Sequence, residues 1–186
     1  MDSHTDTRRP TGRRLLQAAV ATVVALGAPV ALAGTAEALR ARNPQVRIAL
    51  SDPEGSALHA GYTTGTFKAE GSSITEGIGQ GRITGNLDGF TPDLSFRIPD
   101  TEALAIVFGL MREEGLSLGG SSGINVAGAI RLAKALGPGH TIVTILCDGA
   151  ARYASKLFNP AFLAERGLPV PGWLGAEDGP LPDWRA

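Results

Sequence analysis

Residues 119–148, GGSSGINVAGAIRLAKALGPGHTIVTILCD, carry the three signals that decide the fold class. They open on a turn of glycine and serine, and apolar side chains then recur at helical spacing over residues 124–136. Residues 140–148 are nearly all apolar and β-branched, which is typical of a strand covered on both faces. The buried face of the helix is predicted to carry Val126, Ile130 and Ala133.

The preceding segments alternate in the same way. Residues 98–115 predict a helix that Asp100 caps, and LSL at 116–118 predicts a short strand. Residues 34–44 predict another helix, ended by an Asn-Pro pair, and 46–50 predict a strand. Alternating helices and strands predict an α/β fold, a parallel sheet with flanking helices. Ligands of such folds bind at the carboxyl ends of strands, where the serine turn lies.

Composition narrows the function classes. The 186 residues have a net charge of −1 and 43% hydrophobic residues, which is ordinary for a globular protein. No basic excess indicates nucleic-acid binding. The single cysteine, Cys147, excludes an internal disulfide and fits a reducing compartment. Since no Cys/His cluster is present, we expect no metal site.

The two ends of the chain differ from the rest. Residues 1–31 form an atypical segment, basic at first and then apolar, that has the form of a secretory signal. Gly27 and Pro29 interrupt the apolar stretch and argue against a membrane span. Residues 174–186 are a tail rich in proline and glycine. An exported α/β protein with a true signal peptide is therefore one alternative.

The serine turn has two readings from local chemistry. Residues 119–123 match the G-x-S-x-G pattern of a nucleophile elbow, with Asp148 as the candidate acid. That arrangement needs a histidine after the acid, and none follows His140. In the second reading Ser121 or Ser122 only caps the helix by accepting backbone N–H bonds.

A third reading comes from resemblance. EGSSITEGIGQGRIT at 70–84, the stretch 119–148 and RYASKLFNPAFLAERGLP at 152–169 resemble, in this order, the C-terminal part of cysteine synthase (O-acetylserine sulfhydrylase). That family consists of fold-type II, tryptophan synthase β-like enzymes that use pyridoxal 5′-phosphate. The resemblance covers residues 32–173. It implies a cytoplasmic homodimer, neither bound to nucleic acid nor to a membrane, that acts on a small amino acid.

The resemblance also implies site residues. Ser121 would face the pyridine nitrogen of the cofactor, and a neutral hydroxyl there suits elimination because it does not hold a proton on the ring. The expected reaction is transferase or lyase chemistry that converts O-acetylserine and sulfide into cysteine and acetate. Gly77, Ile78 and Gly79 would line the substrate side. The wall beside the ring would be kept thin by Gly119, Gly120 and Gly123.

The sequence departs from the family pattern at two places. None of its three lysines, Lys68, Lys134 and Lys156, has the context of the lysine that holds the cofactor covalently. Residues 27–31 stand where the family has a glycine-rich phosphate loop, and Pro29 has no N–H to donate. We therefore expect a truncated, catalytically incomplete portion with no catalytic residue of its own and an out-of-frame segment before Leu32. A non-enzymatic remnant or dimerising partner module is the alternative.

Overall fold

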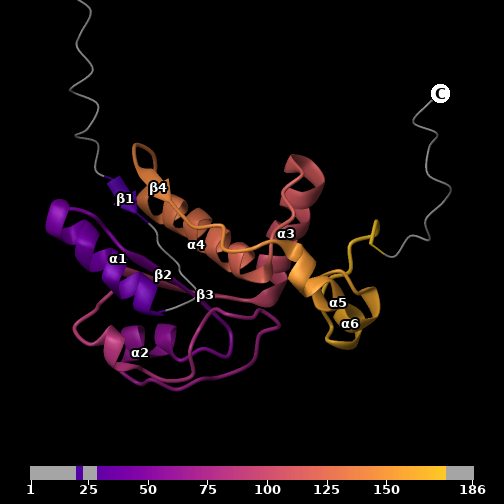
Figure 1. The fold of residues 1–186 in the computed structure, drawn as a ribbon, viewed down its shortest axis with the longest axis horizontal. Helices are drawn as coiled ribbons and strands as arrows, with labels where there is room; N and C mark the ends of the chain where they lie inside the picture. Colours follow the sequence, from indigo (N-terminus) through magenta and orange to yellow (C-terminus); the bar gives the residue numbers. More distant parts are fainter. Residues whose placement is uncertain (1–19, 23–28, 175–186) are drawn as a thin grey trace, which may run out of the picture.

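The computed structural model describes residues 20–22 and 29–174, in which helices pack on pairs of parallel strands (Figure 1). In chain order the elements are β1 Val20–Thr22, α1 Pro29–Arg42, β2 Ala49–Pro53, α2 Leu58–Thr64, the 3-10 turn η1 Gly85–Leu87, β3 Leu94–Ile98, α3 Asp100–Glu114, α4 Gly120–Leu136, β4 Thr141–Val143, the 3-10 turn η2 Ala150–Tyr153, α5 Ala154–Leu157 and α6 Pro160–Glu165.

Two pairs of parallel strands form the described sheet structure. β2 pairs with β3 from Ala49↔Leu94 to Pro53↔Ile98, and β1 pairs with β4 from Val20↔Thr141. The predicted α/β class with parallel strands and flanking helices is confirmed. The strands form two separate pairs within the described ranges, where the sequence suggested one sheet.

Side chains alternate across β2 and place helices on both of its faces. Ile48 and Leu50 lie in one core cluster with Leu32 and Ala36 of α1. Ala49, between them, packs with Leu132 of α4 instead. Because successive side chains of a strand point to opposite faces, α1 and α4 sandwich this strand. Figure 1 shows α3 beside the N-terminal end of α4.

Helix α4 differs from its prediction in two ways. It begins at Gly120, so the glycine and serine residues form its first turn and no separate loop. Its buried face carries Ile124, Gly128 and Leu132, whereas Ile130 is 40% exposed and Ala133 is also exposed. A Cβ at Gly128 would collide with Ser51 of β2, so the absence of a side chain there decides which face packs on the strands.

The prediction that Asp100 caps α3 was wrong. The N-cap is Pro99, and Asp100 is the first helical residue, with its carboxylate turned toward Ser73 and Ile74. The helix itself is confirmed and ends at Gly115, which has a left-handed φ of 68°.

Two strand predictions were also wrong. Residues 116–118 contribute only one isolated bridge, Leu118 with Gly149. The predicted strand 140–148 is reduced to β4, whose Val143 is 44% exposed. Its partner β1 is only three residues long, so the rest of the apolar run has no strand to pair with in the described structure. Neither α2 nor β3 was predicted from sequence.

Most of the signal-like segment 1–31 and all but the first residue of the tail 174–186 lie outside the described residues. Their assignment as separate segments stays a prediction. Of the helices in the described ranges, none is long and apolar enough to cross a membrane.

Candidate functional site

The first turn of α4 holds both serines in the interior. Ser121 is 4% exposed, and its hydroxyl donates to Oδ1 of Asp148 at 3.1 Å. Ser122 is fully buried, and its hydroxyl accepts from the backbone N–H of Cys147 at 2.9 Å. The N-cap is Gly119, which makes no side-chain cap bond. The reading that either serine caps α4 was therefore wrong.

Asp148 accepts hydrogen bonds from three residues around this turn. Its Oδ2 accepts from the phenol of Tyr153, while Oδ1 accepts from Ser121. Its backbone carbonyl accepts from the N–H of Gly119 at 2.9 Å. The hydrogen bond from its phenol to the Asp148 carboxylate raises the pKa of Tyr153, and burial of the phenol adds to the rise.

The glycines of the turn admit close neighbours from other segments. A Cβ at Gly119 would meet the Asp148 carboxylate and, at 2.8 Å, the ring of Tyr153. A Cβ at Gly120 would lie 2.8 Å from Cγ2 of Thr75, and one at Gly123 would lie 2.5 Å from the carbonyl oxygen of Ala103. Each glycine therefore lets one particular segment pack against the helix start.

The loop before Gly77 joins this turn to the start of α3 and to α5. Its Ile74 N–H donates to Asp100 at the start of α3 at 2.8 Å, and the Ser73 hydroxyl donates to the same carboxylate. Thr75 lies against Gly120, and Glu76 forms an ion pair with Lys156 of α5. The loop therefore brings the two regions predicted from sequence, 119–123 and 77–79, to one end of α4.

The predicted substrate loop is held in a special backbone conformation. Gly77 and Gly79 have φ of 73° and 80°, and a Cβ at Gly79 would lie 2.7 Å from Pro53. Ile78, between them, packs on a core cluster that includes Ile124 of α4. A cavity of about 280 Å³ lies beside the loop and is lined in part by Ser56, Ser73, Thr75, Ile78 and Gly79.

Ser56 anchors the far side of this loop. Its hydroxyl accepts from the N–H of Gln80 at 2.8 Å and donates to the carbonyl of the same residue at 3.0 Å. The N–H of Ala57 donates to that carbonyl as well, at 2.6 Å. Residues 77–79 thus lie between two residues that are held in place, Glu76 by its ion pair and Gln80 by its hydrogen bonds to Ser56 and Ala57.

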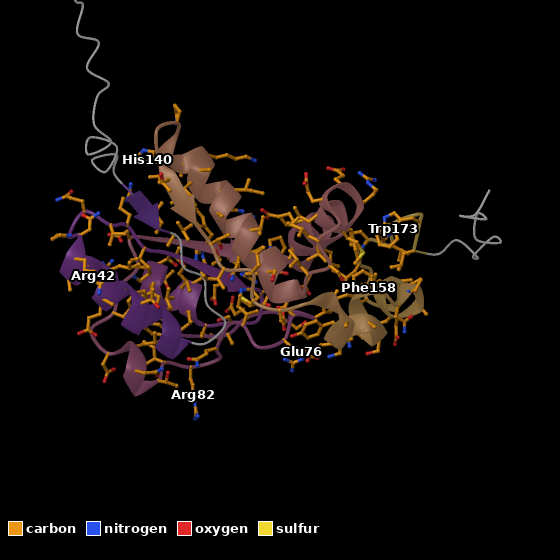
Figure 2. The ribbon with its side chains drawn as sticks, turned by 45° about the horizontal axis from the view of Figure 1, so that its top comes forward. Arg42, Glu76, Arg82, His140, Phe158 and Trp173 are labelled. Carbon is orange, nitrogen blue, oxygen red and sulfur yellow. The ribbon has the colours of Figure 1, made fainter. Side chains whose placement is uncertain are left out.

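A nucleophile elbow does not form. Asp148 contacts Ser121 directly, whereas a triad needs a histidine between the serine and the acid, and no hydrogen bond among the described residues joins a histidine to either. Figure 2 shows His140 at the opposite end of α4 from Glu76. Among the same residues, no group of three or more His, Cys, Asp or Glu side chains is placed to hold a metal ion.

The three lysines occupy surface positions. Lys68 pairs with Glu70 at 3.1 Å and its side chain is 72% exposed. Lys134 is exposed on α4. Lys156 approaches the candidate site only through its ion pair with Glu76.

Sequence reasoning named Asp148 only as a possible triad acid and missed Tyr153. The two side chains lie five positions apart across a segment that contains the 3-10 turn η2 but has no α-helical or strand period, so local patterning does not link them. Ser121 lies 27 positions before Asp148, which places their contact beyond any local signal.

Comparison with known proteins gives one consistent family. The sequence model described as "Pyridoxal-phosphate dependent enzyme" matches residues 12–148. Cysteine synthase 1 of Emericella nidulans is 48% identical over 133 residues, which are 69% of this chain and 36% of that protein. Cysteine synthase 1 of Neurospora crassa is 45% identical over 149 residues, 77% of this chain and 40% of that protein.

A solved structure agrees in fold. The crystal structure of O-acetylserine dependent cystathionine beta-synthase from Helicobacter pylori has a TM-score of 0.66 and 33% identity, and the match covers 76% of this chain and 44% of that one. The chain spans about two fifths of the length of the curated relatives it matches.

Proposed function

Because the chain belongs to the family of pyridoxal-phosphate dependent enzymes, we propose that it forms the ring-binding part of a cysteine synthase-like enzyme. The proposed reaction replaces the acetate of O-acetylserine by sulfide and gives cysteine, a step of cysteine biosynthesis. The observation that carries the proposal is the buried hydroxyl of Ser121 at the start of α4, with the glycine loop packed beside it through Thr75 and Gly120.

The residues of this turn fit one end of the cofactor. In the proposal the Ser121 hydroxyl, which lies 3.1 Å from Asp148, is the neutral polar group that meets the ring nitrogen. In the proposal, Gly119, Gly120 and Gly123 place the backbone beside the ring. Gly77, Ile78 and Gly79 border the substrate and keep water out. When bound, the cofactor draws electrons from the amino-acid substrate so that acetate can leave.

The covalent anchor of the cofactor is not among the residues of this site. Lys68 and Lys156 are paired with glutamates, and Lys134 is exposed on α4. We propose that a lysine outside these 186 residues holds the cofactor, so this chain supplies binding and positioning groups and no catalytic residue. Borohydride reduction in the presence of pyridoxal phosphate then labels none of the three lysines stoichiometrically.

A chimaera tests the function. Residues 32–186 are fused after the N-terminal part of the Emericella nidulans cysteine synthase. We expect visible cofactor absorbance and cysteine formation from O-acetylserine and sulfide. Ser121→Ala should weaken cofactor binding by roughly 5-fold, the effect of one lost hydrogen bond. A folded chimaera that binds no cofactor would overturn the proposal. If the chimaera forms cystathionine with homocysteine and forms no cysteine with sulfide, the second substrate is a thiol amino acid, and the proposed replacement of acetate still stands.

A second candidate is a non-enzymatic partner module, which one observation favours. Ile130, Val143 and Leu146 are 40%, 44% and 47% exposed along α4 and the segment after it. Light scattering combined with a cofactor titration of the chimaera distinguishes the cases, because a partner module dimerises but binds no cofactor. A cytoplasmic homodimer remains the arrangement we propose for the enzyme, and fractionation of the source cells tests the location.

A further inference from the structure

We propose that Asp100 is a positioning residue for the proposed reaction. Through Ser73 and Thr75, the Asp100 carboxylate keeps the glycine loop 77–79 beside the first turn of α4. The link to the reaction rests on the proposed function, whereas the coupling of α3 to the loop rests on contacts within the chain alone.

The Asp100 carboxylate joins the first turn of α3 to the loop. Asp100 is the first residue of this helix and is 7% exposed. The Ser73 hydroxyl donates to its Oδ1, and the N–H of Ile74 donates to its Oδ2 at 2.8 Å. The positive end of the α3 dipole favours a carboxylate at this place. Two charge-assisted hydrogen bonds therefore hold the loop to the helix.

The hydrogen bonds of Ser73 determine how Thr75 is oriented. A carboxylate only accepts, so Ser73 gives its one hydroxyl hydrogen to Asp100. Its two lone pairs accept from the N–H of Thr75 at 3.0 Å and from the Thr75 hydroxyl at 2.6 Å. Because this fixes the hydroxyl of Thr75, its Cγ2 methyl group faces Gly120, 2.8 Å from where a Cβ would lie. The position of Asp100 is thereby passed on to the start of α4.

Cavities border the loop segment 72–75, so packing alone does not hold it. One cavity of about 280 Å³ is lined in part by Ser73 and Thr75. Another of about 350 Å³ is lined in part by Ile74 and Asp100. Since the space beside the segment is partly empty, its hydrogen bonds to Asp100 contribute more to its position than they would in a closely packed interior.

The other anchors of the loop lie further along the chain. Glu76 forms its ion pair with the partly exposed Lys156, and Gln80 is bonded to Ser56. These contacts do not involve Asp100. Loss of the Asp100 bonds should therefore loosen the loop between α3 and Glu76 without unfolding the rest of the chain.

Amide hydrogen exchange of the chain tests the coupling. Asp100→Ala should speed exchange at Ile74 and Thr75 by roughly 10-fold and should also speed it over residues 77–79. Glu102→Ala is the matched control, because it removes the other acidic side chain from the first turn of α3, whose partner is Arg131 of α4 and not the loop. Equal exchange over residues 74–79 in the two variants overturns the proposal.

A second variant covers the case in which Asp100→Ala does not fold. Ser73→Ala leaves α3 unchanged and removes the acceptor of the Thr75 N–H. It should speed exchange at Thr75 and over residues 77–79 as Asp100→Ala would. Unchanged exchange over residues 75–79 in Ser73→Ala contradicts the relay from Asp100 to the loop.

Steady-state kinetics of the chimaera test the consequence for the reaction. Asp100→Ala should raise KM for O-acetylserine by roughly 5-fold, with less effect on kcat and with cofactor absorbance retained, because substrate binding must then also order the loop. Asp100→Asn should restore KM in part, since its amide offers an acceptor to Ile74 and a donor to Ser73. A fall in kcat with unchanged KM overturns the positioning role. An inactive wild-type chimaera contradicts the proposed function, and the exchange data still decide the coupling.

Discussion

Substituting Gly123 by alanine measures how tightly α3 and α4 are joined beside the site. The new Cβ would lie 2.5 Å from the carbonyl oxygen of Ala103 and 2.9 Å from Cγ2 of Val107. The valine can adjust, whereas the carbonyl belongs to the backbone of α3 and moves only with the helix. Overpacking of this kind costs about 1–3 kcal/mol.

Gly109→Ala is the matched control. Gly109 lies inside α3, and a Cβ there has no neighbour within 4 Å, so the change should stabilise the chain by about 1 kcal/mol through helix propensity. Gly123→Ala gains the same propensity term and loses the packing term. The two variants should thus differ by about 1–3 kcal/mol in the free energy of unfolding, with Gly109→Ala the more stable.

Urea unfolding followed by circular dichroism provides the measurement. Both variants change glycine to alanine within a helix, so denatured-state effects cancel to a good approximation. If Gly123→Ala is as stable as Gly109→Ala, the close approach of α3 and α4 is not present in solution. The explanation that Gly123 allows α3 to approach the first turn of α4 would then also be wrong.

Two further predictions concern the strand β2 and the glycine loop. Burial raises the pKa of Asp52, so the contribution of this carboxyl to the free energy of unfolding is fully present below its ordinary pKa of 3.8 and is lost as pH rises through the folded-state pKa. Asp52→Asn should remove this pH-dependent loss from unfolding curves taken across that range. Ser56→Ala should speed amide hydrogen exchange at Gln80 and over residues 77–79 by roughly 5-fold, since both bonds to Gln80 are lost. Ser72→Ala, on the same cavity, serves as its control, and equal exchange in the two variants would contradict the anchoring role.

The parts predicted correctly from sequence have strong local signals. Helix α3 repeats its apolar residues with helical period and ends at a glycine that adopts the left-handed conformation, so local chemistry fixes it. The alternation of helices and strands likewise predicted the α/β class with parallel strands, although β3, the partner of β2, was not itself predicted.

The errors have physical causes that no local pattern shows. Glycine and serine have low helix propensity, so the turn 119–123 read as a loop, but burial against Ala103, Thr75 and Asp148 outweighs that cost. The β-branched run at 140–148 has strand propensity, yet a strand needs a neighbour, and β1 supplies one for three residues only.

One part of the candidate site was predicted from the sequence, and the other part depends on a tertiary contact that the sequence pattern does not show. Ser121 and the loop 77–79 came from resemblance, and the structure brings both to one end of α4 through Thr75. The partner that determines how Ser121 can bind is Asp148, which meets it only after α4 and the following segment have folded back. A serine's role at a ring nitrogen depends on where its one hydrogen goes. That direction is set here by the tertiary contact with Asp148, which lies outside residues 119–123 and is not visible in the local sequence pattern.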